Sequence, residues 1–180
     1  MEPRRRGLTW PNVPLAAAGL ALALAVAGPA GCRKAESDED RIRGIFARAA
    51  TAAEEKRIGD VVAEVSESFR AGDLDRDGAR RLAAGVILRG GWVSASISGT
   101  TVRVEGDQAA AVVDVVLARG SGGAALAALT PGEASVHRFD VRLAREPDGW
   151  RVTAAKWAPA ELADALEGPP EAPSPSEPLR

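Results

Sequence analysis

The strongest constraint on the fold is a change of hydrophobic period near the middle of the chain, at Gly90 and Gly91. Upstream of these glycines, apolar residues recur every three or four positions, which is typical of amphipathic helices. Downstream they alternate with polar residues, which is typical of strands with one buried face. Helices followed by strands predict an α+β domain in which the helices pack on one face of an antiparallel sheet.

Three helices are expected before the change of period. The first has Ser37 as its N-cap, because Ser37 and Asp40 have the spacing of a capping box, and it continues to about Ala53. The second is expected over residues 58–69, where the apolar side chains lie at helical spacing. The third covers residues 79–88 and ends at the glycine pair.

Four strands are expected after it. The first, over residues 93–104, changes its apolar parity at Gly99, which predicts a β-bulge that bends the strand. The second, residues 108–119, is apolar on both sides and is therefore expected at the centre of the sheet. Residues 135–146 and 150–157 form the last two strands, joined by a Pro-Asp-Gly hairpin turn.

The composition excludes several classes of function. The 180 residues carry 23 basic and 25 acidic side chains, which give a net charge of -2. A slightly negative protein does not attract a polyanion, so nucleic acid is not an expected partner. The single Cys permits no internal disulfide. One His and no Tyr leave little for acid/base catalysis or metal binding, and no cofactor is expected.

The first 31 residues have the layout of an export signal. Three arginines, residues 4–6, precede a run of 13 small and aliphatic residues from Leu15 to Ala27. Small residues and Cys32 follow, so a positive head, an apolar core and a cleavage region occur in the order of a secretory signal peptide. The run is shorter than the about 20 residues that a membrane-spanning helix needs.

Cys32 follows Ala30 and Gly31, and this arrangement resembles the lipobox of bacterial lipoproteins. The resemblance implies cleavage before Cys32, lipidation of its thiol and a membrane anchor formed by several acyl chains. Arg33, rather than Asp, follows the Cys, which in Gram-negative lipoproteins favours the periplasmic face of the outer membrane. Plain secretion and an uncleaved spanning anchor are the alternatives.

The chain then divides into four parts. Residues 1–31 are the signal peptide, 32–37 a lipidated tether and 38–166 a single domain. Residues 167–180 hold five prolines and almost no large apolar side chain, so the sequence predicts a disordered tail there.

Residues 38–160 resemble the nuclear transport factor 2-like superfamily. The resemblance rests on the helix pair, the VSESF segment, the bent GGWVSASISGTTVRVEGDQA strand and the closing HRFDVRLAREPDGWRVTAAKW hairpin. It implies a cystatin-like cone, in which a strongly curved antiparallel four-stranded sheet wraps around the N-terminal helices and leaves a pocket at its open end. Members of the superfamily include isomerases, dehydratases, ligand-binding lipoproteins and silent dimerisation modules, so the fold does not define the function.

An acidic segment matches the start of an EF-hand loop through Asp73, Asp75 and Asp77. Calcium needs six to eight oxygen ligands, and the loop's twelfth position, normally Glu, is Ala84 here. Cations also follow the carboxylates directly. We therefore expect a turn whose last carboxylate, Asp77, caps the third helix, rather than a metal site.

His137 is the only imidazole and shares the strand parity of Phe139, which points it toward the concave face. Asp114 on the preceding strand is the carboxylate that could pair with it as an acid/base couple. The alternative is a structural histidine. Trp92, Trp150 and His137 are the candidate pocket residues, although Trp150 and Trp157 differ in parity and at least one of them is expected to pack in the core.

These features favour a non-catalytic, lipid-anchored envelope protein whose cone-shaped domain binds a protein partner or a small apolar ligand. The alternative is an enzyme of the isomerase or dehydratase type that uses Asp114 and His137. A third hypothesis is a homodimer formed through the outer face of the sheet, with Arg138, Asp140 and Arg142 at its rim.

Overall fold

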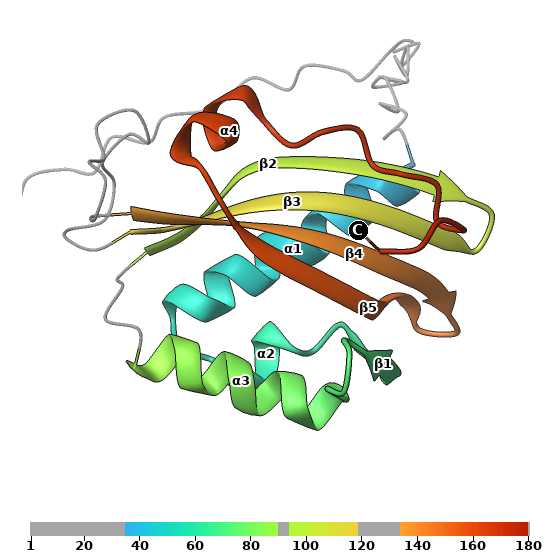
Figure 1. Cartoon of the computed structure of the whole chain (residues 1–180). Helices are drawn as coiled ribbons and strands as arrows, with labels where there is room; N and C mark the ends of the chain where they lie inside the picture. The colour runs from blue at the N-terminus through green and yellow to red at the C-terminus, as the bar shows by residue number, and fades with distance from the viewer. Residues whose placement is uncertain (1–34, 90–93, 119–133, 180) are drawn as a thin grey trace, which may run out of the picture. The chain divides into compact units, whose positions relative to one another are not determined.

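The computed structural model describes residues 35–89, 94–118 and 134–179. They form one α+β unit, whose elements are shown in Figure 1. In chain order these are α1 (Asp38–Glu54), α2 (Ile58–Val61), β1 (Val65–Arg70), α3 (Arg76–Arg89), β2 (Ser94–Glu105), β3 (Gln108–Ala118), β4 (Ala134–Glu146), β5 (Gly149–Ala160) and α4 (Leu162–Glu167). None of the helices in these ranges is long and apolar enough to cross a membrane.

The strands form one curved, unclosed sheet in the order β1-β5-β4-β3-β2. Strands β2 to β5 form an antiparallel meander, whereas β1 pairs with β5 in parallel. Helix α1 lies behind the sheet in Figure 1, and the C-terminal segment crosses in front of it. The α+β class and the packing of the N-terminal helix on one face are as the sequence predicts.

The sheet has five strands instead of the predicted four, because residues 65–70 form β1 rather than the end of a helix. The second helix, α2, is only four residues long. Val65 and Phe69 are four positions apart, which fits the period of a helix and equally the period of a strand. Valine and phenylalanine favour the extended form, and pairing with β5 supplies the main-chain partners that decide between the two.

The concave face of the sheet packs against α1 and forms the main core. Ile42 and Ile45 of α1 are buried there, and Ser37 caps the helix as predicted by accepting a hydrogen bond from the Asp40 amide at 3.1 Å. The neighbouring face of β3 has the small side chains Ala109 and Ala111, which allow the helix close to the strand. The other buried members of the cluster are Phe69, Val113, Val141, Leu143, Trp150 and Val152.

The predicted bulge in the first long strand is confirmed. The register of β2 against β3 shifts between Ile97 and Gly99, so Ser98 is the extra residue. A bulge of this kind bends the strand and increases its twist, which contributes to the curvature of the sheet around α1.

The outer face of the sheet is covered by the C-terminal part of the chain. Ala165 of α4 packs against Val116 and Val136, and further along Ala172 packs against Ala110 and Val112. We expected residues 167–180 to be disordered because of their proline content. In the structure, residues 168–179 lie on the sheet, since a proline-rich segment with small side chains needs little depth to pack there.

Candidate functional site

The candidate site is an aromatic surface on the concave side of β4 and β5. Phe139 and Trp157 are cross-strand partners, and their rings stack with centroids 6.3 Å apart and planes inclined by 29°. Phe139 packs against the main core, yet Trp157 remains 41% exposed. His137 lies two residues before Phe139 on β4, so it leaves the strand on the same face. We call His137, Phe139 and Trp157 the aromatic surface.

This surface lies beyond the part of the sheet that α1 covers. The helix begins beside Trp150, whose indole NH donates to Asp38. It ends near the start of β2, where the Glu54 side chain accepts from the Ala95 amide at 2.9 Å. The aromatic surface lies toward the other end of β4 and β5, away from Trp150 and the hairpin, which leaves Trp157 accessible. An accessible stacked indole with an imidazole nearby can bind a flat or apolar group and offer it one polar contact.

A bulge in β5 places Trp150 and Trp157 on the same face of the sheet. The register of β4 against β5 shifts between Arg142 and Leu143, and the extra residue is Thr153. The expectation that these two tryptophans face opposite ways was wrong, because the bulge resets the parity between them. Trp150 is nevertheless no pocket residue: it is 4% exposed and belongs to the main core.

Trp150 is held by a charged cluster at the end of the core. Its indole NH donates to Asp38 Oδ1 at 3.1 Å, and the Arg145 guanidinium lies 4.6 Å above the ring. Arg145 also bonds to the Asp38 carboxylate. The hydrogen bonds from Arg145 and then Trp150 lower the pKa of Asp38 below its ordinary value. The cluster joins the first turn of α1 to the hairpin of β4 and β5.

The structure does not bring His137 and Asp114 together. His137 is paired with Val115, and both face the concave side, whereas Asp114 is one residue earlier and faces outward. Asp114 is fully buried there and receives two hydrogen bonds from Arg138, from Nε at 2.7 Å and from Nη2 at 2.8 Å. This contact raises the pKa of the Arg138 guanidinium. The proposed acid/base couple therefore has no shared site, and Asp114 is part of a structural ion pair.

The acidic turn before α3 is organised by Asp75 and not by the expected Asp77. Asp75 Oδ1 accepts a hydrogen bond from the Gly78 amide at 2.7 Å, which satisfies one free NH of the first helical turn. The same bond lowers the pKa of Asp75. Asp77 lies inside the helix, which begins at Arg76. Since one carboxylate of the Asp73, Asp75 and Asp77 series is occupied by the helix cap, the series serves as a helix start.

Two predicted site residues, Cys32 and Trp92, lie outside the described residues.

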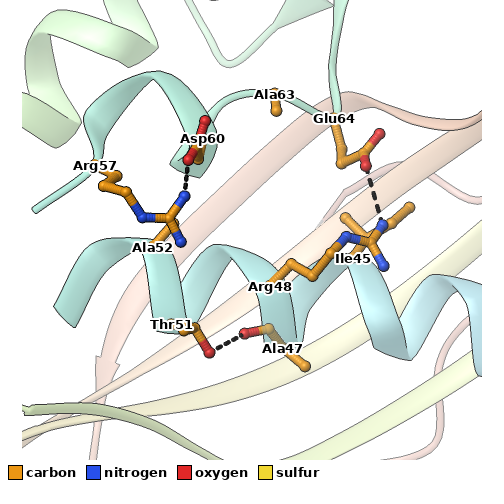
Figure 2. A pocket seen from close by; sticks show the side chains of 9 residues that line it. All are labelled: Ile45, Ala47, Arg48, Thr51, Ala52, Arg57, Asp60, Ala63 and Glu64. Carbon is orange, nitrogen blue, oxygen red and sulfur yellow. Dashed lines mark hydrogen bonds and ion pairs between the residues drawn. The ribbon is translucent and has the colours of Figure 1, made fainter. Parts of the chain in front are cut away.

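A shallow groove of about 460 Å³ is present between α1 and the segment around α2, and Figure 2 shows the side chains that line it. Its charged side chains are already paired with one another: Arg48 with Glu64 at 3.0 Å, and Arg57 with Asp60. Paired charges leave no net field and no converging donors for a ligand. The aromatic surface is therefore the better candidate site.

The fold resembles that of several solved structures. An NTF2-like protein of unknown function from Pseudomonas putida KT2440 is 17% identical with a TM-score of 0.55, over 67% of this chain and 84% of that chain. An NTF2-like protein with a cystatin-like fold from Novosphingobium aromaticivorans is 22% identical with a TM-score of 0.51, over 67% and 80%. A cystatin-like protein of unknown function from Nostoc punctiforme PCC 73102 is 8% identical with a TM-score of 0.52, over 66% and 88%.

No protein-family model matches the sequence, and no curated protein matches it either. At these identities the solved structures define the fold alone. The chain is thus a small α+β protein with a half-open sheet and an aromatic surface on its concave side. In particular, it has the nuclear transport factor 2-like cone, also called the cystatin-like fold.

Proposed function

We propose that the protein is a non-catalytic, lipid-anchored protein of the bacterial cell envelope, and that its cone-shaped domain binds a small apolar ligand on the aromatic surface. The observation that carries the proposal is the position of Trp157. This large ring is 41% exposed although it stacks on Phe139 at the edge of the main core. An exposed aromatic side chain of this kind, continuous with a hydrophobic interior, favours binding of an apolar group.

The chemistry of the surface suggests the kind of ligand. Phe139 and Trp157 offer aromatic contact area, and His137 adds one group that can donate or accept a hydrogen bond. His137 has Pro159 as its cross-strand partner, which donates no hydrogen bond. A flat ligand with a single polar substituent matches this arrangement better than a charged or strongly polar one.

Binding of N-phenyl-1-naphthylamine, an uncharged fluorescent probe with two aromatic ring systems and a single NH, tests the proposal on the purified domain. We expect Trp157→Ala to weaken probe binding by about tenfold, which corresponds to ~1.4 kcal/mol. Leu166→Ala is the matched control, because Leu166 is also an exposed apolar residue, at 57%, but belongs to α4 on the outer face. Equal probe affinities for the Trp157→Ala protein and the unaltered protein would contradict the proposal.

The anchor is tested separately. The proposed lipid attachment rests on the export-signal layout of residues 1–31 and on Cys32 directly after two small residues. We expect Cys32→Ala to abolish cleavage before residue 32 and to move the protein from the detergent phase to the aqueous phase in a phase-partition experiment. The corresponding change at Ser37, Ser37→Ala, alters no part of the signal and should leave partitioning unchanged. Identical processing of the Cys32→Ala and unaltered proteins would exclude lipidation.

A further inference from the structure

The segment that follows α4 occupies a defined position on the outer face of the sheet. We call residues 168–179 the C-terminal strap. It begins at Gly168, whose φ of 90° is a conformation that side chains disfavour and that turns the chain away from the helix. The strap then crosses the sheet, as Figure 1 shows in red.

The face of the sheet is shaped for the strap at Gly99. This glycine faces outward opposite Asp114, and a methyl group on its α-carbon would overlap Pro169 Cδ. Gly99 does not have a positive φ, so its lack of a side chain serves this close approach rather than the backbone conformation. The bulge beside it and the strap thus meet at the one position of the strand that has no side chain.

Two further contacts hold the main chain of the strap, while the Ser174 hydroxyl donates to the Glu105 carboxylate at 3.1 Å. The Thr101 hydroxyl donates to the Pro170 carbonyl at 2.6 Å, and Arg142 Nη2 donates to the Glu177 carbonyl at 2.7 Å. Between them Ala172 is 2% exposed and packs against Ala110 and Val112. Carbonyl acceptors are the polar groups that every residue of a proline-rich segment keeps, since proline has no NH to donate.

We propose that the outer face of the sheet is a docking site for an extended proline-rich segment, and that this chain fills the site with its own C-terminal strap. The site recognises three features of its occupant: a proline over Gly99, two main-chain carbonyls, and a small side chain over Ala110 and Val112. A proline-rich segment is already extended in solution, so it loses little conformational entropy when it docks. The bound strap covers the face that a second copy or another partner would need.

The site holds its occupant reversibly. Arg142 is 9% exposed, and its Nε and Nη1 have no hydrogen-bond partner among the residues that the structure describes. Closing the strap therefore buries a guanidinium that is only partly satisfied, which opposes the favourable contacts. The small contact area of Ala172 adds little to hold the strap in place. We expect the strap to exchange with a free segment of the same sequence.

The test is binding in trans. A chain that ends at Glu167 is mixed with a fluorescent peptide of residues 168–180, and binding is followed by anisotropy. We expect one peptide per shortened chain, and much weaker binding to the full chain, whose tethered strap competes for the same site. Gly99→Ala in the shortened chain should weaken binding by about tenfold or more. Gly59→Ala is the control, because a methyl group there meets no atom within 4 Å. A folded shortened chain that binds no peptide, or that binds it equally with Gly99→Ala, would overturn the proposal.

A second form of the experiment applies if the shortened chain does not fold. A protease site is inserted between Glu167 and Gly168 of the full chain, and the folded protein is then cut. The proposal expects the cut strap to remain with the domain during gel filtration and to be released from the Gly99→Ala variant. Release from the unaltered domain as fast as from the variant would overturn it.

Discussion

Arg138 and Asp114 form a two-pronged ion pair across β3 and β4, with N to O distances of 2.7 and 2.8 Å. The Asp114 side chain has no exposure, and that of Arg138 is 25% exposed. The two residues are direct cross-strand partners on the outer face of the sheet. Each satisfies the other, so a charged pair is tolerated among the apolar residues that α4 and the C-terminal strap cover.

Removal of Asp114 should therefore destabilise the fold. Asp114→Ala leaves a mostly buried guanidinium without its acceptor, and we expect a loss of about 2–3 kcal/mol in the free energy of unfolding, measured by urea denaturation. The partial exposure of Arg138 keeps the loss below that of a fully buried pair.

The double variant Asp114→Val with Arg138→Leu separates charge from packing. Because it removes both charges and keeps apolar volume, it should recover most of the stability that the single change loses. If the single and double variants were equally unstable, the loss of stability would come from altered packing and not from the unpaired charge.

The charged cluster around Asp38 predicts a dependence of stability on pH. The Asp38 pKa is lowered below its ordinary value of 3.8 by hydrogen bonds from Arg145 and Trp150. The stabilisation is thus complete above about pH 5, starts to decrease near pH 4 and is lost as the pH falls through the lowered pKa. Urea denaturation at a series of pH values from 6 to about 2 should show this loss.

Asp38→Asn is the matched variant for this titration, since asparagine keeps the shape and one acceptor but does not titrate between pH 2 and 6. It should be less stable at pH 6 and should lose less stability than the unaltered protein on acidification. Parallel pH profiles for the two proteins would show that Asp38 does not contribute to the dependence.

The two carboxylates at the start of α3 should differ in importance. Asp75 accepts the Gly78 amide at 2.7 Å, whereas Asp77 is already inside the helix. We expect Asp75→Ala to lower the thermal midpoint and Asp77→Ala to change it much less. Asp75→Asn, which retains a capping oxygen, should restore most of the difference. A larger effect of Asp77→Ala than of Asp75→Ala would show that Asp75 is not the residue that caps the helix.

The core prediction concerns Ile42, which has no exposure between α1 and the sheet. Ile42→Ala should reduce the free energy of unfolding by about 2–5 kcal/mol, through lost burial and the cavity that remains. Leu88→Ala, on the 59% exposed Leu88 of α3, should stay within about 0.5 kcal/mol of the unaltered protein. Calorimetry or urea denaturation measures both.

The sequence predicts the local features of the fold because they depend on near neighbours. The Ser37 cap, the Gly99 bulge and the β4-β5 hairpin each have a signal within a few residues. Strand β1 has no such signal, since Val65 and Phe69 fit both a helix and a strand. Its identity depends on main-chain pairing with β5, far along the sequence.

The candidate site shows how a single position of register changes an assignment. Asp114 and His137 belong to neighbouring strands, but cross-strand partners are Asp114 with Arg138 and Val115 with His137. A difference of one residue moves a side chain to the opposite face of the sheet. The turn between β4 and β5 would likewise place Phe139 opposite Lys156, and only the bulge at Thr153, which has no glycine to mark it, places it opposite Trp157.

Composition also misled the prediction for the C-terminal strap. A proline-rich segment without large apolar side chains has too little hydrophobic surface to order itself. Here the sheet supplies the apolar surface, and the absence of a side chain at Gly99 allows the close contact. The features that order the segment belong to the sheet on which it packs, so the composition of the segment does not indicate them.

The parallel pairing of β1 with β5 has a consequence for the order of folding. The neighbouring ion pair between Glu64 and Arg151 joins residues 87 positions apart. While the chain emerges from a ribosome, β1 has no partner strand until β5 has also emerged. A topology with such distant contacts forms slowly, because the entropy of closing a long loop is lost before the paired strands stabilise the structure. We therefore expect truncated nascent chains to remain protease-sensitive until β5 is complete.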